Sequence, residues 1–242
     1  MKTLIEIYDF LDSISPFISQ ESWDNSGILL GKKSQKISKI FLSLEATKTI
    51  AESLESNSLL ITHHPLIFKP LKNICSDFYP SNILEILIKK NIALIAMHTN
   101  FDLSHLNKNF VKKILGFKDF RIKDFVIKVS FNAKFSDLLA ILETKMPDSI
   151  FKITQSSDFI NDLIIVCGAG VSAISDENIA KNDCIITGDV KYHDAMKFLS
   201  LGISIIDVGH YHSERHFGEI LQKNLKKIGY KGIILPSQNP FS

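Results

Sequence analysis

The sequence is short of cysteine and tryptophan, and this scarcity leaves several kinds of site without support. Among its 242 residues there are only three cysteines, Cys75, Cys167 and Cys184, and a single tryptophan. Because no two cysteines form a CxxC pair, thiolate zinc sites and dithiol redox sites are unsupported. An odd number of isolated cysteines is typical of a protein in a reducing compartment.

Long apolar runs, an apolar leader and a concentrated basic surface are also lacking. No run approaches the roughly 20 apolar residues that a bilayer-spanning helix needs, and Glu6 and Asp9 fall where a secretory signal would be apolar. The 28 basic and 26 acidic residues give a net charge of +2, and the lysines are scattered along the chain. We therefore expect a soluble, cytoplasmic protein that binds neither a membrane nor nucleic acid.

What the sequence does contain is a regular alternation of apolar strands and amphipathic helices. This order predicts an α/β protein with two similar lobes, residues 1–120 and 121–242, each with a mixed, partly parallel sheet. The polar stretch from Gly116 to Asp124 is the predicted boundary. Strands are predicted at 28–30, 40–44, 59–62, 92–97, 163–167, 184–187, 203–208 and 232–235, and helices at 3–13, 47–56, 81–90, 174–181, 192–199 and 213–227.

Unusual polar residues follow directly after several of these predicted strands. Open α/β sheets place their ligand sites at the C-terminal ends of strands, and such sites favour the interface between two lobes. The residue types described next are metal ligands. We therefore expect a metal site in the cleft between the lobes.

The first polar group is the pair His63 and His64, which ends the strand at 59–62 and precedes Pro65. At a strand end the backbone turns, so two adjacent imidazoles can reach one cavity, and Pro65 holds His64 extended. An isolated pair would more often consist of one core and one surface histidine. A polar pair directly after a buried strand favours a ligand role instead.

The second polar group, His98 and Asp102, follows the strand at 92–97 on what reads as a loop. Asp102 is a candidate ligand, and a turn or helix cap is the alternative for it. His98 could be a core histidine bonded to the backbone. We favour Asp102 over His98 as a ligand and assign His98 a proton-transfer role.

The third polar group, His210 and Glu214, follows the strand at 203–208. Four residues apart at the start of a helix, both side chains lie on one face, which suits a metal pair. The alternative is that Ser213 caps the helix while Glu214 favours its dipole. His212 and His216 have the same spacing and are expected to be the more exposed pair.

Together these groups offer three histidines and two carboxylates. One divalent ion takes three or four protein ligands and leaves a position for water, so five ligands suit two ions that share a carboxylate. Nitrogen and oxygen donors suit Fe, Mn, Zn, Co or Ni without discriminating among them. Two ions about 3.5–4 Å apart activate water, which favours hydrolysis of a small molecule. The candidate ligands are His63, His64, Asp102, His210 and Glu214.

Around these residues the sequence resembles the NIF-three-like family (the YbgI/YqfO group), whose members are often named GTP cyclohydrolase I type 2 homologues. The resemblance implies a two-lobed α/β subunit, a dinuclear metal centre with the same five ligands, and a ring-shaped homohexamer. One departure is the segment 44–47, which reads Leu-Glu-Ala-Thr where the family has an apolar residue, Asp, any residue and Thr. The matching motifs are WDNSGILLG at 23–31, ITHHPLIF at 61–68, HTNFD at 98–102, ITGDVKYHDA at 186–195 and GHYHSE at 209–214.

The resemblance also implies a reaction, the attack of activated water on the imidazole ring of a guanine nucleotide. No GxxxxGK[ST] loop is present, and the glycine-rich segment 168–173 is a weak dinucleotide-like fingerprint for which tight packing is the alternative. Lys191 and His193 are the nearest candidates for phosphate contact and proton transfer, with capping or surface roles as alternatives. A non-catalytic metal-delivery protein or ring-shaped scaffold is the alternative function.

Overall fold

The computed structural model describes residues 2–241, and the contacts within it divide the chain into two compact units. Unit 1 comprises Met1–Ser104 and His216–Gln238, and unit 2 comprises His105–Arg215 and Asn239–Ser242. Each unit holds one sheet with both parallel and antiparallel pairs, flanked by helices. The expected α/β class with two mixed, partly parallel sheets is therefore confirmed.

The sheet of unit 1 has the strand order β1-β4-β3-β2-β11. Its central strands pair in parallel, and β1 pairs antiparallel with β4. Strands β2, β3 and β4 are buried at every residue, as expected for parallel strands that helices cover on both faces. The strands are β1 (Gly27–Leu30), β2 (Ile40–Ser43), β3 (Leu59–Thr62), β4 (Ala93–Ala96) and β11 (Gly232–Ile234).

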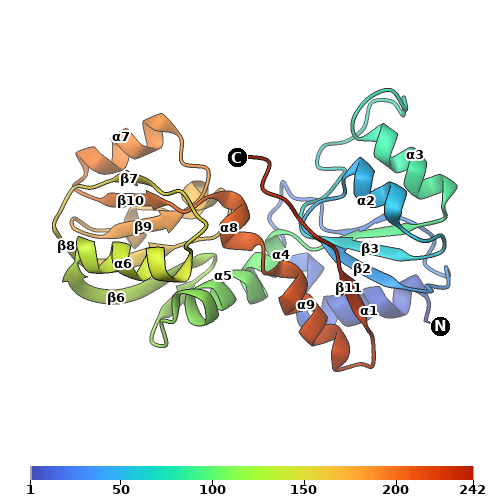
Figure 1. Cartoon of the computed structure of the whole chain (residues 1–242), viewed down its shortest axis with the longest axis horizontal. Helices are drawn as coiled ribbons and strands as arrows, with labels where there is room; N and C mark the ends of the chain where they lie inside the picture. Colours follow the sequence, from blue (N-terminus) through green and yellow to red (C-terminus); the bar gives the residue numbers. More distant parts are fainter. Residues whose placement is uncertain (1, 242) are drawn as a thin grey trace. The chain divides into compact units, whose positions relative to one another are not determined.

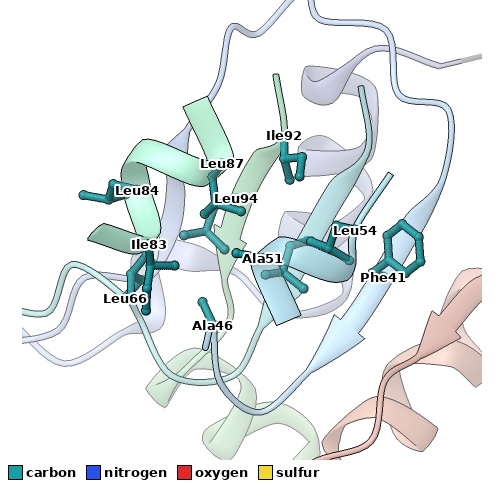
Figure 2. Packing of buried hydrophobic residues seen from close by; sticks show 11 residues of the cluster. Phe41, Ala46, Ala51, Leu54, Leu66, Ile83, Leu84, Leu87, Ile92 and Leu94 are labelled. Atoms are coloured by element: carbon teal, nitrogen blue, oxygen red, sulfur yellow. The ribbon is translucent and has the colours of Figure 1, made fainter. Parts of the chain in front are cut away.

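Helices cover both faces of this sheet (Figure 1). The helices α2 (Lys48–Ser53) and α3 (Ser81–Lys89) lie on one face, and α1 (Leu4–Ile14) and α9 (Phe217–Lys226) lie on the other. A close view of the first face shows leucine and isoleucine side chains filling the space between α2, α3 and the strands (Figure 2). This packing fixes the strands, and so it also fixes the loops that leave their C-terminal ends.

The segment His216–Gln238 belongs to unit 1, so the chain does not divide at the single boundary expected at 120/121. Strand β11 pairs in parallel with β2, and α9 buries Phe217, Leu221 and Leu225. Strand β11 covers the open edge of β2, and the apolar face of α9 packs on these two strands. The sequence carries no local signal for this long-range pairing. The chain therefore leaves unit 1 after Ser104 and returns to it at His216.

The sheet of unit 2 has the strand order β5-β6-β8-β9-β10-β7. Its centre, β8-β9-β10, is parallel, and the outer pairs are antiparallel. In place of the helix expected at 174–181 there are two short 3-10 turns, η4 (Gly170–Ala173) and η5 (Asp176–Asn178). The regular elements are β5 (Arg121–Lys123), β6 (Val126–Lys134), α6 (Phe135–Lys145), β7 (Lys152–Thr154), β8 (Phe159–Ile165), β9 (Cys184–Thr187), α7 (Tyr192–Ser200), β10 (Ser204–Asp207) and α8 (His210–Glu214).

A helical stretch from Thr99 to Leu115 corrects the loop expected around Asp102. It consists of α4 (Thr99–Phe101), a π-helical turn η2 (Asp102–Leu106), α5 (Asn107–Asn109) and a second π-helical turn η3 (Phe110–Leu115). Turns of π-helix are rare and frequently mark functional positions, and Asp102 begins the first one. No helix among residues 2–241 is long and apolar enough to cross a membrane.

Candidate metal centre

The candidate ligands of unit 1 lie where the parallel strands end. His63 and His64 follow β3, His98 follows β4, and Glu45 follows β2. Since parallel strands place their C-terminal ends at one edge of the sheet, these loops meet there. The topology thus brings residues from three separate loops to one edge of the sheet.

Three imidazoles form a cluster at this edge. One ring nitrogen from each of His63, His64 and His98 lies within 4.8 Å of the others. Asp102 adds a carboxylate, with its Oδ1 atom 3.5 Å from Nε2 of His63. His63 is fully buried, so its side chain is held in one place. This set of nitrogen and oxygen donors fits a divalent cation without any thiolate.

An acceptor holds the Nδ1 atom of each histidine. The Nδ1 atom of His63 lies 2.8 Å from the carbonyl oxygen of Met97, and the Nδ1 atom of His98 lies 2.8 Å from Oδ1 of Asp24. Because these acceptors favour the tautomer with the proton on Nδ1, the Nε2 atom presents its lone pair. Histidines that bind metal through Nε2 are oriented by such partners.

Asp24 is a residue that sequence reasoning missed as part of the site. Its side chain is fully buried, and its Oδ2 atom accepts hydrogen bonds from the backbone amide and hydroxyl of Thr99. Burial opposes ionisation, but the hydrogen bond from His98, with those from Thr99 and Asn25, holds the pKa of Asp24 well below its usual range. Asp24 therefore remains a carboxylate that orients His98.

The position of Asp24 follows from strand direction. The antiparallel strand β1 begins where β4 ends, with Gly27 opposite Ala96. A residue shortly before β1 therefore lies beside a residue shortly after β4. The sequence shows a turn that contains Asp24 before the strand at 28–30. Only the pairing of β1 with β4 places that turn beside His98.

Glu45 occupies the position at which this sequence departs from the family pattern. Its carboxylate contacts Nδ1 of His64, and its side chain is 54% exposed. The longer glutamate still supplies an acceptor for this candidate ligand, as the family's aspartate would. Glu45 is thus an orienting residue for His64.

Unit 2 carries a second set of donors with the same design. The Nε2 atom of His210 lies 2.9 Å from Oε2 of Glu214, and its Nδ1 atom lies 2.7 Å from Oδ2 of Asp189. Asp189 follows β9 and His210 follows β10, so two strand ends again provide a candidate ligand and the carboxylate that contacts it. The spacing predicted that His210 and Glu214 would meet on one helix face, and within α8 they do.

Gly168 leaves room for the Glu214 carboxylate. It has a left-handed φ of +62°, and a Cβ atom there would lie 2.1 Å from Oε1 of Glu214. Gly170 faces Val166 and Thr187 at similarly short distances. Gly168 therefore allows close packing against Glu214, and Gly170 allows it against Val166 and Thr187. This agrees with tight packing, the alternative to a dinucleotide fingerprint.

We expect Gly168→Ala to weaken divalent-metal binding by about 10- to 100-fold, the range for losing a group that positions a ligand. The added methyl group displaces the carboxylate, which is the flexible end of its side chain, and so the fold survives. Gly116→Ala is the control, because Gly116 also has a positive φ but nothing lies within 4 Å of the added Cβ. It should cost only about 1 kcal/mol of backbone strain. Equal metal affinity in the two variants, by calorimetric titration, would refute this role.

Other sequence candidates lie elsewhere in unit 2. Lys191 is the N-cap residue of α7 and His193 lies in its first turn, and both side chains are exposed. His212 is buried, contrary to the expected exposed pair, because α8 turns it inward. Burial lowers its pKa. The roles suggested for Lys191 and His193 stay predictions.

A family model described as Duf34/NIF3 (NGG1p interacting factor 3) matches residues 2–240 of the chain. A protein of Helicobacter pylori (strain J99) named "GTP cyclohydrolase 1 type 2" is 45% identical over 241 residues, covering 99% of this chain and 98% of the relative. A "GTP cyclohydrolase 1 type 2 homolog" of Campylobacter jejuni is 46% identical over 239 residues, covering 98% of both.

Solved structures share the fold. Staphylococcus aureus protein SA1388 superimposes with a TM-score of 0.86 at 22% identity, covering 100% of this chain and 99% of that one. Reduced HcgD from Methanocaldococcus jannaschii gives a TM-score of 0.83 at 23% identity, covering 98% of both chains.

Proposed function

The chain belongs to the Duf34/NIF3 family, and from this premise we propose that it is a dinuclear-metal hydrolase that acts on a nucleotide or related heterocycle. The family resemblance seen in the sequence motifs is thereby confirmed. The observation that carries the proposal is that each of the three proposed histidine ligands has an acceptor at Nδ1, which turns Nε2 towards the metal position. The relatives named GTP cyclohydrolase 1 type 2 supply the substrate class.

The proposed ligands come from both units: His63, His64 and Asp102 from unit 1, and His210 and Glu214 from unit 2. Their places in the chain support a shared centre. Asp102 lies two residues before the chain leaves unit 1, and Glu214 lies two residues before the chain returns at His216. Phe217, three residues after Glu214, packs its ring against that of His63 at 5.2 Å.

When bound, the two ions supply a water nucleophile at neutral pH and a positive field for the developing charge. The chain's own residues hold these side chains in place: Glu45 orients the ligand His64, and Asp189 orients the ligand His210. Asp24 orients His98, which lies beside them. In the proposal His98 also takes up and returns a proton, with His193 as a second candidate and Lys191 as a phosphate contact. The donor set accepts Fe, Mn, Zn, Co or Ni.

The family resemblance further supports a homohexamer of 27.3 kDa chains working in the cytoplasm. Neither assembly nor location enters the chemistry proposed above. Light scattering of the native protein gives the assembly directly.

The test of the function is turnover by protein loaded anaerobically with each candidate metal. We expect about two ions per chain at saturation and consumption of GTP that stops on chelation, followed by chromatography of the products. Saturation at one ion per chain would contradict a centre in which five ligands hold two ions. A chain that binds two ions but consumes no nucleotide would favour a metal-delivery or scaffold protein.

A further inference from the structure

A cavity of about 390 Å³ opens in unit 1 beside the histidine cluster. It is lined by segment 66–81, which begins two residues after His64 and leads into α3. Its volume lies within the range of about 300–1,000 Å³ that is usual for small-molecule sites. None of the metal ligands lines it, so this cavity is a feature separate from the ion site.

Aromatic rings line the cavity and remain in water. Phe68, Phe78 and Tyr79 are 43%, 67% and 70% exposed. Burying these three aromatic side chains would stabilise the fold, so their exposure along one short segment is typical of a binding surface. Rings placed in this way are suited to stack against a planar base, an interaction that tolerates any base because every base has a π-face.

The base of the cavity is anchored to the core of unit 1. Leu66, which lines the cavity, is buried against the cluster under α3, where it lies beside Ile83 (Figure 2). The side-chain amide of Asn25 donates to the carbonyl oxygen of Ile67 at 2.6 Å. The exposed rings therefore project from a segment whose start is fixed.

A ring contact and a nearby charge relate the cavity to the histidine cluster. The Phe68 ring lies 6.3 Å from that of His98, with Trp23 edge-on to Phe68 at 5.9 Å. On the other side, partial burial and the nearby Glu45 carboxylate raise the pKa of Tyr79. Glu45 itself contacts His64. A molecule held in the cavity would therefore lie next to the residues that hold the metal ligands.

Positive charge completes the lining. Lys69 and Lys72 are exposed at the cavity, and within residues 2–241 the ion pairs of the lysines involve neither of them. A lysine without a carboxylate partner is available to a phosphate. Aromatic rings and uncompensated lysines in one cavity match a planar ring that carries an anion.

We propose that this cavity, called here the aromatic pocket (segment 66–81), holds the base and phosphate of a nucleotide, with the base stacked on Phe78 and Tyr79 and the phosphate held by Lys69 and Lys72. The proposal rests on the proposed function, because it names where the substrate of that hydrolase is bound. It adds residues outside the metal centre that determine the substrate class.

Trp23, the single tryptophan, reports on the aromatic pocket through its contact with Phe68. We would titrate metal-loaded full-length chain with GMP and follow Trp23 fluorescence, using guanosine and inorganic phosphate as probes that lack one half of the ligand. A repeat on chelated protein removes contacts between phosphate and metal.

The variants are Phe78→Ala and the double variant Lys69→Gln/Lys72→Gln. Matched controls are Phe159→Ala, an exposed ring in unit 2, and Lys36→Gln.

GMP should quench the fluorescence saturably, and Phe78→Ala should weaken GMP and guanosine alike by about fivefold or more. The double lysine variant should weaken GMP but not guanosine, and the controls should bind as the parent chain does. GMP affinity unchanged in both pocket variants overturns the proposal, as does the absence of saturable binding. If the pocket variants bind as the parent chain does while GTP is still hydrolysed, the pocket fails and the function stands. If the parent chain binds GMP in the pocket but hydrolyses no nucleotide, the proposed function fails and the pocket stands.

Discussion

Glu214→Gln is expected to lower the affinity for divalent metal by more than about 100-fold and to abolish turnover. The carboxylate is nearly fully buried, at 2% exposure, and lies 2.9 Å from the Nε2 atom of His210. A ligand that contacts the ion contributes more than an orienting group, whose loss costs about 10- to 100-fold. The amide keeps the shape of the side chain but provides no negative charge, so metal content and nucleotide hydrolysis fall together.

The fold of the Glu214→Gln variant should survive, because replacing a buried carboxylate by a neutral amide removes a charge that is costly to bury. Circular dichroism and thermal unfolding of the metal-free variant check this. Glu219→Gln is the matched control: Glu219 lies on α9, is 60% exposed and is 3.6 Å from His216. Metal analysis that finds the parent content in Glu214→Gln would exclude Glu214 as a ligand.

Metal affinity is expected to fall steeply as the pH drops from roughly 7 towards 5. Free histidine titrates near pH 6.5, and imidazole binds metal only when neutral. The metal-free protein therefore binds protons that the metal-bound protein cannot. Lowering the pH favours the metal-free form. With three histidine ligands proposed, we expect the protein to take up at least two protons when the metal centre is emptied. Two protons correspond to a loss of about a hundredfold in metal affinity for each pH unit below the range in which histidine titrates.

Calorimetric titrations at several pH values measure this slope, and circular dichroism of the chelated chain shows whether the fold remains. We expect it to remain, because buried apolar strands such as β3 and β9 supply the core. An affinity that is flat across this range would mean that histidines are not the ligands. Global unfolding on chelation would make the site structural and remove most of the support for hydrolysis.

Much of the fold was predictable because local patterns carry it. The apolar runs at 59–62 and 184–187 are strands with the expected bounds. Thr47 caps α2 as its position indicates, with its Oγ1 accepting the Ile50 amide at 3.2 Å. The sequence also offers Ser81 as an N-cap for the helix predicted at 81–90, but Ser81 is the first residue of α3, whose N-cap is Pro80. Interior parallel strands give the clearest signal, since both of their faces are apolar.

The elements that escaped prediction have weak or nonlocal signals. Strand β6 is half exposed, and a register shift between Ser130 and Ala133 interrupts its alternation beside Asn132, which has a positive φ. Strand β11 lies within the strand predicted at 232–235, but its parallel pairing with β2 was not predicted. At the site, polar residues after strands identified His63, His64, His98 and His210. The acceptors that orient these histidines depend on which strands are neighbours, and a single sequence does not show this.

The return of the chain to unit 1 sets an order for its synthesis. The segment 105–215 is contiguous, so a ribosome completes it while unit 1 still lacks α9 and β11. Until those last elements emerge, β2 presents an open edge, and such edges invite pairing with other chains. The ring of Phe217, which packs against His63, is also made late. A nascent chain therefore contains its histidine cluster long before the surroundings of that cluster are complete. Folding of unit 1 is finished only when the segment that holds α9 and β11 has been added.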